Sequence, residues 1–174
     1  MSVPPHKTQL HVSLIQLDSV VLALPQSNLH SVESALDIKP AVDAGSAACI
    51  KLHGQEWPVY CPTDNLVAVN VITDDQRICA MLISGDSLFG LVCREVISVE
   101  AAQLRPFKLP DCMRTPDTPL HGVGILGERV VCLTSAPALL ALFKAGHGGS
   151  VPGLTSTQLH PRGEPVTDIT EASA

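Results

Sequence analysis

A nucleophile beside a general base is the combination in this chain that could do covalent chemistry. Two cysteines lie in loop-like sequence, Cys61 beside a proline and Cys112 in a proline-rich segment, and His53 and His121 are possible bases. A pair drawn from these residues would make a cysteine-dependent hydrolase. No local signature of such an enzyme surrounds any of them, so the sequence favours ordinary thiols and surface imidazoles.

Metal sites and phosphate-binding loops are not indicated either. The cysteines and histidines lack the short paired spacings that hold structural zinc. The glycine clusters at 122–124 and 146–149 do not sit between a strand and a helix with the spacing that cradles phosphate. Adjacent acids such as Asp74 and Asp75 are typical of a solvated turn. We predict no metal, no cofactor and no enzyme activity.

Composition narrows the classes of partner. The chain has 174 residues, a net charge of −6, no basic run and only 3% aromatic residues, so we expect no nucleic-acid partner. No apolar stretch approaches the ~20 residues needed to cross a bilayer, and no signal-peptide pattern opens the chain. These features predict a cytoplasmic protein without membrane insertion. Four cysteines fall in apolar, strand-like runs and are expected to be buried free thiols: Cys49, Cys79, Cys93 and Cys132.

The elements that would position any site are mostly strands. Residues 78–99 form two apolar runs around Ser84-Gly85-Asp86-Ser87, which predicts a tight hairpin because glycine tolerates the positive φ that such turns require. Apolar residues alternate onto both faces of this hairpin, so we expect both faces to be buried. Three further hairpins are predicted around positions 18, 54 and 127. The return strand at 57–60 carries Pro58, which predicts an edge or a bulge.

The remaining segments are less regular. We expect a strand at 66–72, a long surface connection at 101–120, and a helix at 136–145 capped by Ser135 and stopped by Gly146. For residues 28–36 the sequence allows two secondary structures, a helical turn capped by Asn28 or a strand containing Leu29 and Val32. Loops are predicted at 1–9 and 40–45, and a disordered tail at 146–174. The pattern as a whole predicts an all-β sandwich or barrel.

Four stretches together resemble the CheW-like domain, the adaptor module of bacterial chemosensory arrays, over about residues 10–143. They are LIQLDSVVLALP at 14–25, CIKLHGQEWPV at 49–59, FGLVCREVISV at 89–99 and GVGILGERVVCLTSAPALLALF at 122–143. The family pattern is matched at Gly54, Pro58, Val59, Gly90, Leu91, Val96 and Val99. It is not matched at five positions, where this chain has Ser31, Lys51, His53, Cys61 and Arg94.

The resemblance implies two small five-stranded β-barrels packed side by side within residues 10–145, followed by a short helix. The first barrel would span about 20–74 and the second about 75–135, and the resemblance allows the first strand and the closing helix to cross between them. A groove between the barrels would receive the cytoplasmic tip of a chemoreceptor. Another face would dock on the regulatory domain of a CheA-type histidine kinase, in a chemotaxis or type IV pilus system.

The residues that the resemblance places at partner contacts are Lys51, His53, Gly54, Gly90, Arg94, Val96 and Val99. On this hypothesis, Val99→Asp abolishes binding and leaves the fold intact. A small barrel that binds a ligand or a nucleotide second messenger is the alternative. It would need clustered arginines at a barrel mouth, and the arginines of this chain are scattered along the sequence.

Overall fold

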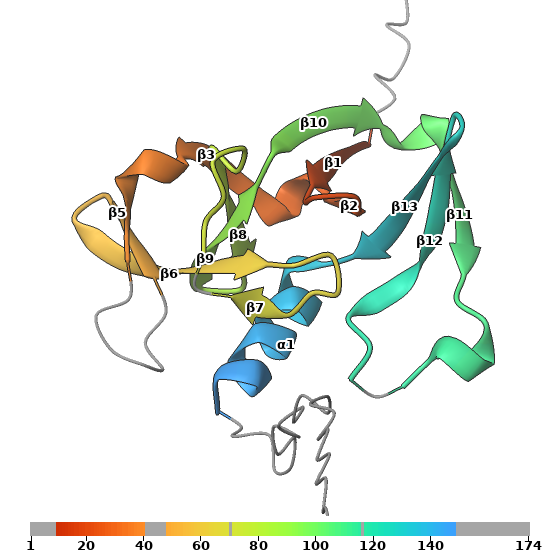
Figure 1. Ribbon diagram of the computed structural model, residues 1–174. Helices are drawn as coiled ribbons and strands as arrows, with labels where there is room; N and C mark the ends of the chain where they lie inside the picture. Colours follow the sequence, from red (N-terminus) through yellow and green to blue (C-terminus); the bar gives the residue numbers. More distant parts are fainter. Residues whose placement is uncertain (1–9, 41–47, 70, 116, 149–174) are drawn as a thin grey trace, which may run out of the picture.

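The computed structural model describes residues 10–40, 48–69, 71–115 and 117–148. These residues form two curled sheets and a C-terminal helix, α1 (Ala136–Gly148), as Figure 1 shows. The all-β prediction is therefore confirmed. The predictions for residues 1–9, for most of the 40–45 loop and for the tail from residue 149 onward lie outside the described residues.

The first sheet combines strands from both ends of the described chain. Its order is β10-β1-β2-β13-β12-β11, antiparallel except for the parallel pair β2 and β13, where Leu22 lies opposite Cys132. The predicted first and last hairpins are both present. The strands are β1 (His11–Gln16), β2 (Val21–Pro25), β10 (Glu95–Glu100), β11 (Leu104–Lys108), β12 (Leu120–Leu126) and β13 (Arg129–Thr134).

The second sheet is built from the middle of the chain. Its order is β3-β8-β9-β6-β5-β4, with β7 paired to β6. The strands are β3 (Leu29–Ser34), β4 (Ile38–Lys39), β5 (Ala48–Leu52), β6 (Gln55–Pro62), β7 (Ala68–Val69), β8 (Ile78–Ser84) and β9 (Ser87–Cys93). Short 3-10 turns are η1 (Gln26–Asn28), η2 (Ala35–Asp37), η3 (Ala101–Gln103) and η4 (Asp111–Met113).

This division differs from the predicted boundaries at 20–74 and 75–135. The hairpin β8–β9 pairs with β3 and β6 and so belongs to the second sheet, while β1, β2 and β10 belong to the first. The chain leaves the first sheet after β2 and returns to it only at β10. Contiguous boundaries cannot describe this arrangement, because sheet membership depends on pairings between strands distant in sequence.

The predicted burial of the central hairpin on both faces is present. Ala80 and Leu82 face the shared core, which contains residues of both sheets and of α1, with Tyr60 stacked on Phe143 at a ring-centroid distance of 4.9 Å. Cys79 and Met81 face the second-sheet core, inside the curl of that sheet. The hairpin thus joins two apolar clusters. The first sheet encloses a third, the first-sheet core, formed by Leu14, Val21, Ala23 and Val131.

Three predicted strand features need correction. The strand expected at 66–72 is reduced to β7, because Leu66 adopts a positive φ of 59° that breaks the extended backbone. Pro58 lies in an interior strand, just before the two-residue parallel pairing of β6 with β9 begins at Val59. The 101–120 connection contains β11, whose Pro106 is tolerated because β11 is an edge strand.

The helix prediction also changes. Helix α1 runs three residues beyond the predicted end at 145 and includes Gly146. At its start, the side-chain carbonyl of Asn28 accepts a hydrogen bond from the N–H of Ala136 at 2.9 Å, while the Ser135 hydroxyl lies 2.9 Å from Nε2 of His121. Residues 28–36 are largely strand β3, so Asn28 caps a helix distant in sequence instead of starting its own.

Candidate functional site

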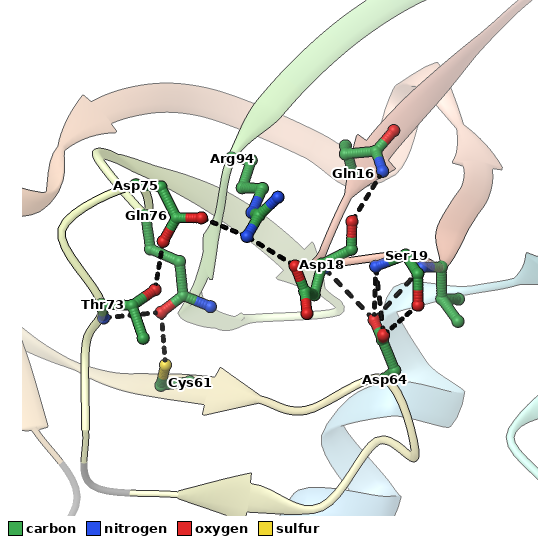
Figure 2. Close-up of polar contacts among 10 residues, drawn as sticks. Gln16, Asp18, Ser19, Cys61, Asp64, Thr73, Asp75, Gln76 and Arg94 are labelled. Carbon is green, nitrogen blue, oxygen red and sulfur yellow. Dashed lines mark hydrogen bonds and ion pairs between the residues drawn. The ribbon is translucent and has the colours of Figure 1, made fainter.

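A polar cluster fills the junction of the two sheets (Figure 2). Arg94, between β9 and β10, forms ion pairs with Asp18 in the β1–β2 turn and with Asp75 in the β7–β8 connection. Its backbone N–H donates to the carbonyl of Gln16 at 2.9 Å. Because Asp18 belongs to the first sheet and Asp75 to the second, one guanidinium bridges both.

Asp64 makes a second connection between the sheets. It lies in the β6–β7 loop, and its carboxylate accepts the backbone N–H groups of Asp18, Ser19 and Val20 at 3.0–3.2 Å, together with the Ser19 hydroxyl. Successive N–H groups that converge in this way form an anion-binding nest. These donors stabilise the ionised carboxyl and lower the pKa of Asp64, the Ser19 hydroxyl being the largest cause.

A cavity of about 420 Å³ opens beside these side chains. Asp18 and Asp75 are paired with the guanidinium of Arg94, and Asp64 accepts backbone N–H groups, so the described lining of this cavity offers no cluster of free cations to a phosphate ligand. The geometry thus gives no support to the second-messenger alternative. The cavity is lined by Asp18, Cys61, Pro62, Thr63, Asp64, Asn65, Val69, Val71, Thr73, Asp75, Gln76 and Arg94.

Cys61 lines this cavity but is poorly suited to nucleophilic chemistry. Its Sγ lies 3.0 Å from the carbonyl oxygen of Val71 and 3.2 Å from Oε1 of Gln76, so the single thiol proton has two acceptors within reach. Burial raises the pKa of the thiol, so the neutral form is favoured over the reactive thiolate. His121, one predicted base, is engaged with Ser135 in the first sheet. The geometry disfavours the hydrolase alternative at Cys61.

A second hollow, the hairpin-end pocket, lies where the turns of β5–β6 and β8–β9 come together. Its volume is about 270 Å³, and it opens onto the second-sheet core, against which Leu52, Trp57 and Leu88 are packed. Its lining residues are His30, Leu52, His53, Gln55, Trp57, Ile83, Gly85, Asp86, Ser87 and Leu88.

The outer face of β11, β12 and β13 exposes large apolar side chains. Phe107 is 50% exposed, Ile125 38% and Val130 65%. The strand register places Arg105, Ile125 and Val130 side by side on this face, with Phe107 opposite Val123 on the same face. We refer to Arg105, Phe107, Ile125 and Val130 as the outer face. Contiguous exposed apolar side chains of this kind are typical of protein-binding surfaces.

Comparison with known proteins bears on the fold. No protein-family model matches the sequence, and no curated protein matches it. Among solved structures, the chain is similar to the scaffolding protein TtCheW from Thermoanaerobacter tengcongensis, with a TM-score of 0.57 and 15% sequence identity, over 78% of this chain and 90% of that one. The chain has a CheW-like fold.

The predicted contact residues of this CheW-like chain fall into two groups. Lys51 is exposed on β5, and His53 and Gly54 form the β5–β6 turn with positive φ values of 51° and 83°. Two successive positive φ values match the turn that two-residue hairpin loops prefer. The second group, on β9 and β10, lies at the junction of the sheets and along the first sheet.

In this second group only Arg94 is well exposed. Val96 is half-buried against the shared core, and Val99 is half-buried against the first-sheet core opposite Val12. Gly90 is buried: a Cβ built there would lie 2.6 Å from Sγ of Cys79 and 2.9 Å from Cγ2 of Val59. The prediction of partner contact at Gly90 is therefore corrected, since its absent side chain lets β6 and β9 approach closely.

Several residues of these sites were missed from the sequence. Asp18, Asp64 and Asp75 were not singled out, because nothing in the sequence shows that two of these acids pair with Arg94 and that the third accepts the N–H groups of the β1–β2 turn. His30 and Asp86 were missed at the hairpin-end pocket for the same reason. The one signal available was Arg94 itself, a charged residue directly after a strongly apolar strand.

Among the described residues, no helix is long and apolar enough to cross a membrane.

Proposed function

We propose that this chain is a non-catalytic adaptor of a bacterial chemosensory system, working in the cytoplasm. It couples chemoreceptors to a CheA-type histidine kinase by protein binding, in chemotaxis or in a type IV pilus system. The observation that carries the proposal is the CheW-like fold, shared over 90% of the length of a protein described as a scaffold. A shared fold supports a shared role only by analogy, so we assign each partner from the exposed side chains of this chain.

The kinase regulatory domain is assigned to the outer face of the first sheet. An apolar centre with a charged rim is the usual anatomy of a protein interface, and an exposed aromatic residue such as Phe107 is a typical anchor. Val130, the most exposed of the three apolar side chains, is the position at which a charge would most directly oppose docking.

The receptor tip is assigned to the residues predicted from the sequence, Gly90 excepted. Lys51, His53 and Gly54 present the exposed end of the second sheet. Arg94, Val96 and Val99 belong to the junction of the sheets and the strand that leaves it. Since Val96 and Val99 are half-buried, each would pack partly against the core of this chain and partly against the partner.

The test is binding of the purified kinase regulatory domain from the same organism, measured by calorimetry. We expect Val130→Asp to weaken binding at least tenfold, because a carboxylate would be buried against an apolar partner. Ser27→Asp, which places the same charge on an exposed residue of η1, should bind like the unmodified chain. Equal affinity of the two variants would refute the assignment of this face, and no binding by the unmodified chain would refute the kinase as partner.

A further inference from the structure

The strands that carry the outer face differ in charge from the rest of the chain. Residues 104–108 and 120–134 contain three cationic side chains, Arg105, Lys108 and Arg129, and one anionic side chain, Glu128. With histidine neutral, this part of the chain has a surplus of two positive charges, whereas the whole chain has a net charge of −6. An acidic surface is therefore repelled by the molecule as a whole and attracted by these strands.

Arg105 is the charged side chain that the strand register places on the outer face itself. It lies opposite Ile125, which in turn lies opposite Val130. Phe107, two residues further along β11, is on the same face. The other two cations are the terminal residues of β11 and β13, and their partners in the register belong to the opposite face of the sheet. One guanidinium thus stands among the exposed apolar side chains.

The donors of this guanidinium are not used within the described part of the chain. Arg94 and Arg114 are paired with aspartates, but no carboxylate of the described residues pairs with Arg105, which is exposed. A planar guanidinium can donate two parallel hydrogen bonds to one carboxylate. Arg105 is therefore able to bind a carboxylate of another molecule.

The open edge of β11 does not invite a further strand. Pro106 lies in the middle of this edge strand, and a proline there discourages strand addition because it lacks an N–H group. A partner would meet this part of the sheet through side chains on the outer face.

Covering the outer face has a consequence for which partners it accepts. A partner that packs on Ile125 and Val130 also removes water from Arg105, because these residues are neighbours in the register. A partner without a carboxylate at this point would leave a desolvated cation unpaired, which is strongly unfavourable. The apolar side chains favour binding, and the guanidinium discriminates between partners.

We propose that Arg105 makes the outer face specific for a partner surface that sets a carboxylate among apolar side chains. The inference rests on the proposed function, in which this partner is the regulatory domain of the kinase. It adds the chemistry that the kinase surface presents and the residue of this chain that recognises it.

The test is binding of the purified kinase regulatory domain from the same organism, measured by calorimetry at about 50 mM and about 300 mM NaCl. We expect Arg105→Gln to bind about tenfold more weakly at the lower salt concentration, because the carboxylate of the partner loses its charged donor. The affinity of this variant should also depend less on salt than that of the unmodified chain, an effect that a purely structural role would not produce.

Lys51→Gln is the matched control, because it removes the same charge from an exposed position on β5. Figure 1 shows β5 and β11 on opposite sides of the molecule. This control should bind like the unmodified chain at both salt concentrations. Both substituted positions are exposed, so we expect the urea unfolding midpoints of both variants to match that of the unmodified chain.

The outcomes separate this inference from the proposed function. Equal affinities of Arg105→Gln and Lys51→Gln would overturn the role of Arg105, whether both bind normally or both bind weakly. The kinase assignment would still stand if Val130→Asp weakened binding. No binding by the unmodified chain would refute the kinase as partner and the inference together.

Discussion

Gly90 shows how a residue that resembles a binding position can be a packing position. A Cβ at this site would lie too close to Cys79 and Val59, both buried in the second-sheet core. We expect Gly90→Ala to lower the free energy of unfolding by about 1–3 kcal/mol, measured by urea denaturation, because the core is overpacked. Gly146→Ala, at a helical position with open space around it, should be neutral or stabilising by up to ~1 kcal/mol. Equal effects of the two substitutions would contradict this packing role.

Asp64 connects a loop of the second sheet to a turn of the first through the N–H groups that it accepts. Because its pKa is lowered in the folded state, its ionised form stabilises the protein above the ordinary pKa of aspartate, and this contribution is lost as the pH falls through the folded value. We expect Asp64→Asn to cost about 1–2 kcal/mol at pH 7. The stability of Asp64→Asn should also fall less steeply in acid.

Thermal unfolding between pH 2 and 7 checks this prediction. Asp117→Asn removes an exposed carboxylate and is the matched control, expected to follow the unmodified chain. Parallel curves for Asp64→Asn and the unmodified chain would show that the nest does not depend on the charge of Asp64.

At the scale of elements, the hairpins were predictable and the strand pairings between them were not. Gly54, Gly85 and Gly127 mark turns that local geometry requires, and each adopts a positive φ. The strand at 66–72 failed because its β-branched composition suggested extension, whereas the left-handed conformation of Leu66 is fixed by the loop hydrogen bond from its N–H to the carbonyl of Thr63. Composition reports the preference of a segment and not the constraints of its neighbours.

The position of Val99 on β10 changes the effect that we expect from the Val99→Asp substitution. Val99 is half-buried in the first-sheet core and lies opposite Val12, so an aspartate there must desolvate its charge. Contrary to the expectation from sequence, we expect this variant to be destabilised by about 1–3 kcal/mol in urea titrations. Val130→Asp, on an exposed strand position, should change stability by less than ~1 kcal/mol. A Val99→Asp protein as stable as Val130→Asp would place Val99 at the surface after all.

At the scale of the whole molecule, the Arg94 side chain bridges the two sheets through its ion pairs with Asp18 and Asp75. Exposed ion pairs add little to global stability, so removing them should act mainly on local order. We expect Arg94→Gln to increase amide hydrogen exchange in the β1–β2 turn and the β7–β8 connection, with the unfolding midpoint nearly unchanged. Arg114→Gln, which breaks an exposed pair within one loop, is the control. Unchanged exchange in both segments would show that the bridge does not order the junction.

The division of the chain into two sheets was the part of the fold least accessible from sequence. Residues 78–93 form the last two strands of the second sheet, and β10 follows them in the first sheet. No local sequence feature marks the point at which the chain returns to the first sheet. The junction site shares this origin, since Asp18 and Asp75 meet Arg94, and Asp64 meets the β1–β2 turn, only after both sheets have formed. A likeness in order and spacing indicated the fold, but it could not supply contacts that this chain makes with residues of its own.

The adaptor proposal requires two partners on one molecule at the same time. The most direct measurement is size-exclusion chromatography with light scattering on a mixture of this chain, the kinase regulatory domain and the receptor tip fragment from the same organism. We predict one complex whose mass accounts for all three components. When this chain is left out, the kinase domain and the receptor fragment should elute separately. If the kinase domain and the receptor fragment both elute free of this chain, its role as an adaptor is contradicted.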